Sequence, residues 1–258
     1  TFHNYVLINQ GTQTLSNTYF GVWVDADVGT ATDDYVGCDV QRGLGYSYNG
    51  DAVDEPSSSS QGYGENPPAV GIDFFEGPYQ DADSIDNPLT SNFSNAIDSL
   101  GIPYEGIGIG YGDGIVDNER FGMRRFVYYN NSGNQINGEP STPLHFYNYM
   151  NGIWKNGQKM AYGGDGVSAA TGANLDIEAD YMFPGDTDPF NWGTGGTTVE
   201  PWTEVTSGNP PADRRFIQAA GPFTLEPGDY NNITMGVVWA RATAGDPEES
   251  VKLMRIAD

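Results

Sequence analysis

The clearest pattern along the chain is an alternation of apolar and other residues over 19–27. Phe20, Val22 and Val24 would share one face of an extended segment, and Trp23 would lie on the other. A period of two is typical of a β-strand that buries one face. This segment therefore predicts a strand that ends in an acidic stretch.

Residues 233–241 read Ile-Thr-Met-Gly-Val-Val-Trp-Ala-Arg and are apolar on both faces, which predicts an internal strand. Shorter strand signals occur at 5–9, 44–48, 70–75, 126–129, 175–183 and 216–220. Turn residues separate them, among 35 Gly and 16 Pro in the chain. The pattern predicts a mainly β fold: β-sandwich-like antiparallel sheets with two short amphipathic helices and long loops.

The first helix is expected to begin after Thr142, which can act as the N-cap, with Pro143 at the first helical position. Its apolar face would consist of Phe146, Tyr149, Met150, Ile153 and Trp154. The second helix is expected after Asp246-Pro-Glu-Glu249, because acidic residues stabilise the positive end of a helix. Val251, Leu253 and Met254 would supply its apolar side.

The sequence allows two interpretations of the domain organisation. Residues 1–258 form either one β-rich domain or two intimately packed sub-sheets that divide near 130–142. The second helix stops abruptly at the last residue, and the chain starts without a signal peptide. We therefore expect the chain to be an excerpt of a longer protein.

Charge narrows the range of partners. The chain carries 35 acidic and 11 basic residues, a net charge of -24, so its field repels phosphate backbones and nucleic-acid binding is not expected. No apolar run is long enough to predict a membrane span. A single Cys38 excludes an internal disulfide, so an exported chain would need another kind of cross-link.

The sharpest local motif is Tyr111-Gly-Asp-Gly-Ile-Val-Asp-Asn-Glu119. Side chains of Asp113, Asp117 and Glu119, with the carbonyl of Ile115, could supply oxygen ligands to one hard cation. The spacing resembles the short calcium loops of dockerin-like and thrombospondin-type repeats. This motif predicts a Ca²⁺ site, and a solvated acidic turn is the alternative.

A second acidic cluster follows the predicted strand at 19–24 and contains Asp25, Asp27, Asp33 and Asp34. Four carboxylates within ten residues repel one another unless a cation or solvent separates them. The cluster is a second candidate Ca²⁺ site, with an exposed acidic loop as the alternative.

Enzyme signatures are mostly absent: the chain has no HExxH, G-x-S-x-G or phosphate-binding loop, so an enzyme is less expected than a binding or structural role. Glycoside hydrolysis by a pair of carboxylates stays an alternative. It needs only two acids at the right separation, and the sequence does not indicate which of the 35 acids would form such a pair. Trp192 and Trp202 lie in polar, Gly-rich segments and could stack on a glycan, or could cap the edge of the core.

Two arginine pairs, Arg124-Arg125 and Arg214-Arg215, are unusual in so acidic a chain. Alternation along a strand turns one arginine of each pair inward, where it needs a carboxylate or an aromatic face. These pairs predict structural clasps.

Several blocks resemble large secreted proteins of Bacteroidota that are exported by the type IX secretion system. The blocks are Trp23-Val-Asp-Ala-Asp27, Asp33-Asp-Tyr-Val-Gly-Cys-Asp39, Asn66-Pro-Pro-Ala-Val-Gly71, His145-Phe-Tyr-Asn-Tyr-Met-Asn-Gly-Ile-Trp-Lys155, Tyr181-Met-Phe-Pro-Gly-Asp186, Gly208-Asn-Pro-Pro-Ala-Asp-Arg-Arg-Phe216 and Gly221-Pro-Phe-Thr-Leu-Glu-Pro-Gly228. The resemblance covers most of residues 19–258. It implies an extracellular or outer cell-surface location and an export machinery as partner, and it carries no known activity.

Together these observations predict a calcium-stabilised extracellular module with an adhesive or structural role, whose partner is a glycan or a surface protein. The alternative is a secreted glycan-binding or glycan-active domain.

Overall fold

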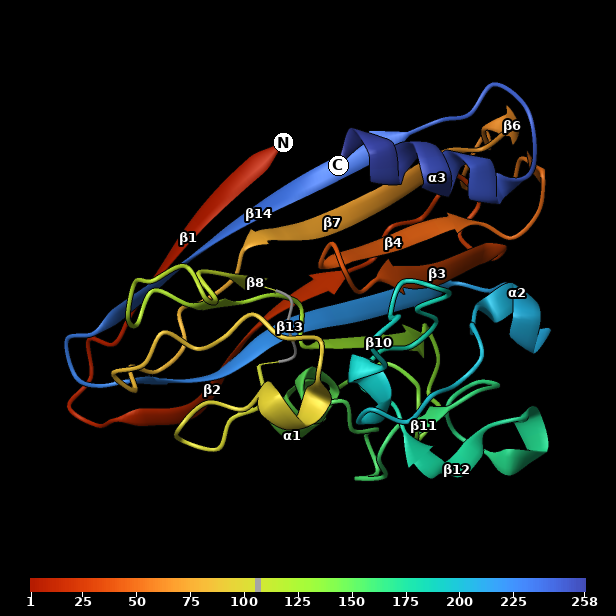
Figure 1. Cartoon of the computed structure of the whole chain (residues 1–258). Helices are drawn as coiled ribbons and strands as arrows, with labels where there is room; N and C mark the ends of the chain where they lie inside the picture. The colour runs from red at the N-terminus through yellow and green to blue at the C-terminus, as the bar shows by residue number, and fades with distance from the viewer. Residues whose placement is uncertain (105–107) are drawn as a thin grey trace.

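The computed structural model describes residues 1–104 and 108–258 and confirms a fold made mainly of strands. The larger sheet has five strands in the order β1-β14-β7-β4-β3, all antiparallel to their neighbours (Figure 1). Its strands are β1 (Phe2–Ile8), β14 (Tyr230–Ala240), β7 (Ala69–Glu76), β4 (Leu44–Asn49) and β3 (Asp34–Asp39). The smaller sheet has the order β10-β13-β2 and consists of β10 (Arg125–Asn130), β13 (Arg214–Leu225) and β2 (Leu15–Val24).

The two sheets face each other across one core. Side chains from both inner faces belong to a single buried cluster, including Val36 and Met235 of the larger sheet and Phe126 and Phe216 of the smaller. Side chains of the smaller sheet pack directly against Gly45 of the larger, where a Cβ atom would lie 2.3 Å from Gln218 Oε1. The core draws on residues on both sides of 130–142.

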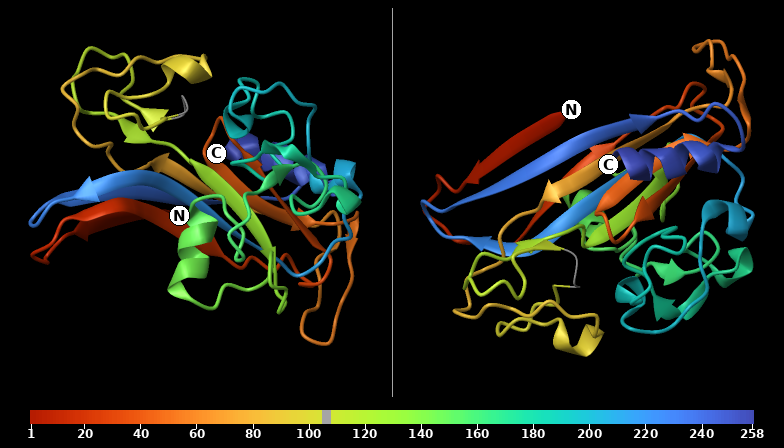
Figure 2. Two further views of the ribbon diagram at one scale, coloured as in Figure 1. Left: turned by 90° about the horizontal axis from the view of Figure 1, so that it is seen from below. Right: turned by 45° about the horizontal axis from the view of Figure 1, so that its top comes forward.

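Helices cover the outer faces of this sandwich, as two views show (Figures 1 and 2). Helix α3 (Pro247–Ala257) packs on β14, β7 and β4, and helix α1 (Pro143–Met150) packs on the smaller sheet. Val251 and Met254 lie on the buried side of α3, whereas Leu253 is exposed. The prediction that Leu253 belongs to the apolar side of this helix was therefore wrong.

The first helix begins as predicted, because the Thr142 hydroxyl accepts a hydrogen bond from the His145 amide. It ends at Met150, four residues earlier than the predicted face requires. Gly152 adopts a left-handed conformation with φ of 68°, and the chain turns there. Trp154 is still fully buried, but it reaches the core from this turn.

The remaining elements are short and lie within the long loops that the sequence predicts. Three two-stranded ribbons pair β5 (Val53–Asp54) with β6 (Gly64–Glu65), β8 (Gly108–Ile109) with β9 (Arg120–Phe121), and β11 (Ala161–Tyr162) with β12 (Asn174–Glu178). The other short elements are the helix α2 (Glu204–Ser207) and the 3-10 turns η1 (Phe93–Asn95), η2 (Ala169–Thr171) and η3 (Trp192–Thr194). Within the described residues, no helix has the length and apolar character needed to cross a membrane.

The arginine pairs form the predicted clasps. Arg214 is buried and its guanidinium lies 2.8 Å from the Glu204 carboxylate, while Arg215 reaches carboxylates on the outer face. Arg124 is likewise buried, with its guanidinium over the Phe121 ring, and Arg125 contacts Asp180.

Candidate metal centre

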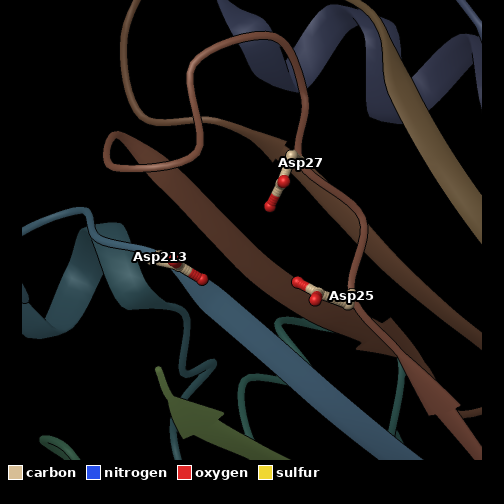
Figure 3. Close-up of side chains that lie close together, drawn as sticks. All are labelled: Asp25, Asp27 and Asp213. Carbon is tan, nitrogen blue, oxygen red and sulfur yellow. The ribbon is translucent and has the colours of Figure 1, made fainter. Parts of the chain in front are cut away.

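Three carboxylates converge at one end of the smaller sheet. Asp25 follows the last residue of β2, Asp27 lies two residues further, and Asp213 immediately precedes β13. Strands β2 and β13 are antiparallel, with Val24 opposite Phe216, so the end of one strand meets the start of the other. Figure 3 shows the three side chains directed toward one another. Each offers one oxygen, and these oxygens lie within 4.8 Å of one another.

This spacing is compatible with one cation bound by all three carboxylates. Oxygens that bind one calcium ion at about 2.4 Å can be no more than about 4.8 Å apart. Among the described residues, Asp25, Asp27 and Asp213 are the only group of three or more acidic, histidine or cysteine side chains that meets this condition. They could supply three of the six to eight oxygen ligands that the ion takes.

Positive charge at this centre comes from Arg215. Its guanidinium lies 3.0 Å from Asp25, 3.7 Å from Asp213 and 2.8 Å from Glu139. Three carboxylates therefore share one guanidinium, and Asp27 adds a fourth negative charge beside them. Burial, followed by the charges of Asp25 and Asp213, raises the pKa of Asp27. Within the described part of the chain, no basic side chain forms an ion pair with Asp27.

Asp33 and Asp34 do not join these three carboxylates. Asp34 begins β3 with its side chain buried, and one of its oxygens accepts a hydrogen bond from the Val28 amide at 3.0 Å. The other Asp34 oxygen is buried with no hydrogen-bond partner among the described residues, as is one oxygen of Asp33. Burial above all, with added repulsion from neighbouring acids, raises the pKa of Asp34 to about 8 and that of Asp33 to about 6.

The structure does not bring the acids of 113–119 together. Asp113 accepts from the Ile115 amide and the Asn118 side chain, whereas Asp117 accepts from the Asp83 and Ser84 amides at 2.8 Å. Glu119 is buried and accepts from the Asn87 amide. The predicted four-ligand loop around Asp113, Ile115, Asp117 and Glu119 is therefore replaced by carboxylates that bind separate amides.

The two tryptophans singled out in the sequence lie in the core. Trp192 is 1% exposed and contacts the rings of Phe93 and Phe190. Trp202 is 3% exposed, and its indole N–H donates to the Ser207 hydroxyl at 2.8 Å. Neither indole offers a face to a glycan in this structure, which favours the interpretation that they cap the core.

Sequence reasoning found Asp25 and Asp27 but missed Asp213, which lies far away along the chain. The available signal was the neighbouring Arg214-Arg215 pair. A basic pair in so acidic a chain marks a place where carboxylates gather, and Asp213 directly precedes it.

Searches against protein-family models, curated proteins and solved structures found no match to this chain.

Proposed function

We propose that this chain is a calcium-stabilised module of an extracellular or surface-attached bacterial protein, with an adhesive or structural role. The observation that carries the proposal is the convergence of Asp25, Asp27 and Asp213, whose oxygens lie within 4.8 Å of one another, while Arg215 pairs with only Asp25 and Asp213 among them. A divalent ion would offset the excess negative charge and join the end of β2 to the start of β13.

The neighbouring acids support the same conclusion. A buried carboxylate oxygen without a hydrogen-bond donor is costly unless it gains a proton or a cation. Asp33 and Asp34 each have such an oxygen, and the Asp27 charge contributes to the raised pKa of Asp34. This end of the sandwich would therefore be more stable with additional positive charge.

The chain has one cysteine, Cys38, which is buried and unpaired, so no disulfide joins its parts. A cation at the centre would supply the missing cross-link. The extracellular location and type IX export follow from the sequence resemblance and are part of the proposal.

Thermal unfolding with and without calcium tests the proposal. Extracellular calcium sites have dissociation constants of about 0.1–1 mM. Calcium at about 20 times its Kd would stabilise the fold by about 1.8 kcal/mol. For a chain of this size that corresponds to a rise in Tm of about 4–7 °C relative to EGTA.

The variants Asp27→Asn and Asp213→Asn should lose this rise in Tm. Asp113→Asn is the matched control, because its carboxylate lies outside the centre, and it should keep the wild-type response. An unchanged wild-type Tm in EGTA would overturn the proposal. Full calcium responses in both Asp27→Asn and Asp213→Asn would overturn the assignment of the site.

A further inference from the structure

A cleft of about 430 Å³ opens beside the metal centre. One wall is the segment Asp25–Val28 that leaves β2, and the other consists of Tyr63, Pro68, Val70 and Trp239. Val70 and Trp239 are directly opposed on β7 and β14, so their side chains emerge from the same face of the larger sheet.

The walls of this cleft are held in place by buried and bidentate contacts. Asp54 is fully buried, and its carboxylate accepts from the Thr30 amide on one side and the Tyr63 amide on the other, at 2.9 and 2.6 Å. Arg241, two residues after Trp239, donates to the carbonyls of Tyr63, Glu65 and Asn66. The cleft is therefore formed before any ligand arrives, which reduces the entropy cost of binding.

The cleft combines two exposed aromatic rings with carboxylates. Trp239 is 54% exposed and Tyr63 is 42% exposed, although most large aromatic side chains of this fold lie in its core. An indole that remains accessible in a formed cleft offers an apolar face, and Asp25 and Asp27 line the same cleft as hydrogen-bond acceptors.

We propose that this cleft binds a carbohydrate, with a sugar ring stacked on Trp239 and its hydroxyl groups donating to Asp27 and Asp25. A pyranose has an apolar C–H face and a rim of hydroxyl donors, and these two properties match the two kinds of side chain in the cleft. The cleft volume lies within the range of about 300–1,000 Å³ that is typical of small-molecule sites.

Charge selects the kind of sugar. The chain has a net charge of -24 and two of the cleft residues are aspartates, so the cation-free cleft repels uronic-acid and sulfated glycans. The expected ligand is a neutral oligosaccharide. This inference rests on the proposed adhesive role and not on the bound cation, because the contacts require only Trp239 and the carboxylates.

Isothermal titration and saturation-transfer NMR with cellohexaose, mannohexaose, xylohexaose and chitohexaose, and with hexagalacturonate as an anionic probe, test the inference. At least one neutral hexasaccharide should bind with a Kd of about 0.1–1 mM, and hexagalacturonate should not bind. Trp239→Ala should weaken binding about tenfold, equivalent to about 1.4 kcal/mol, and Trp239→Tyr should restore most of it.

Tyr230→Ala is the matched control, because Tyr230 is an exposed aromatic residue at the opposite end of β14 and should not affect binding. Each titration is run in calcium and in EGTA, beside the melting curves. Sugar binding without a calcium effect on Tm would support the cleft and overturn the cation proposal. A calcium effect on Tm without binding of any neutral hexasaccharide would support the cation proposal and overturn the carbohydrate proposal. Equal affinity of wild type and Trp239→Ala would overturn the assignment of the cleft.

Discussion

The buried pair Glu204–Arg214 joins four elements of the fold. The Glu204 carboxylate at the start of α2 accepts from Arg214 of β13 at 2.8 Å and from the Val36 amide of β3 at 3.1 Å. Arg214 also donates to Asn130 of β10 and lies over the Tyr128 ring, 5.3 Å from its centroid. Both side chains are nearly inaccessible, at 0% and 6% exposure.

Replacing Glu204 with Gln keeps the shape of the side chain but removes the charge that balances Arg214. A buried charge left without its partner costs about 3–5 kcal/mol. Each kcal/mol corresponds to about 2–4 °C in a domain of this size, so Tm should fall by about 6–20 °C. Urea unfolding followed by circular dichroism measures the free energy directly, through the midpoint and the slope.

Two further variants make the result interpretable. The double variant Glu204→Met with Arg214→Met removes both charges. Its loss of stability should be smaller than the summed losses of the single variants Glu204→Met and Arg214→Met, and the difference is the coupling energy of the pair. Lys252→Met breaks the exposed Lys252–Glu249 pair and should change stability very little, because solvent screens an exposed ion pair. If Glu204→Gln costs as little as Lys252→Met, the pair is not the clasp that the structure indicates.

Three other predictions concern pH, packing and the acidic loops. Burial, followed by repulsion from Asp258 and Asp39, raises the pKa of Asp73 to about 8 from an ordinary 3.8. Because the folded state holds this proton more tightly than the unfolded state, the free energy of unfolding should fall by up to about 4 kcal/mol as pH rises from 5 to 8. Urea unfolding of Asp73→Asn should show a smaller fall. An equal pH slope in both proteins would contradict this prediction. Gly45→Ala places a methyl group 2.3 Å from Gln218 Oε1 and 2.7 Å from the Phe126 ring, so it should cost about 1–3 kcal/mol in the same assay; an unchanged midpoint would mean that the sheets can separate at this point. Asp117→Ala leaves the Asp83 and Ser84 amides without their acceptor, and hydrogen exchange at these two amides should accelerate while Tm changes little; unchanged exchange would show that these bonds do not order the loop.

Alternation in the sequence was enough to predict most of the sandwich, and its failures have physical causes. Strands β2 and β14 carry regular apolar patterns, and both form as expected. Strand β3 was missed because Asp34-Tyr-Val-Gly-Cys-Asp39 carries an acid at each end and a glycine within, although every one of its residues is buried. The acids are tolerated through tertiary partners, such as Arg42 and Arg255 around Asp39.

Only part of the candidate metal centre could be predicted from the sequence, because one of its carboxylates comes from a distant segment of the chain. Local spacing identified Asp25 and Asp27, but it also suggested Asp33 and Asp34 as their partners. The turn that follows Asp27 instead places Asp34 inward at the start of β3. The third carboxylate, Asp213, depends on the pairing of β2 with β13, which local sequence does not specify.

The two acidic loops differ in whether every carboxylate has a hydrogen-bond donor from the protein. Asp113, Asp117 and Glu119 each accept protein hydrogen bonds, so a cation would have to compete with donors already in place. At the end of the sandwich, Asp25 accepts from Arg215 and Asp213 accepts from Asn131. Asp27 accepts no hydrogen bond from any described residue, and one oxygen of Asp34 is buried without a donor. Acid density alone is therefore a poor guide to metal binding in this chain. Under the proposal, the excess of carboxylates over basic partners distinguishes the end of the sandwich, so we expect calcium to act there and not at 113–119.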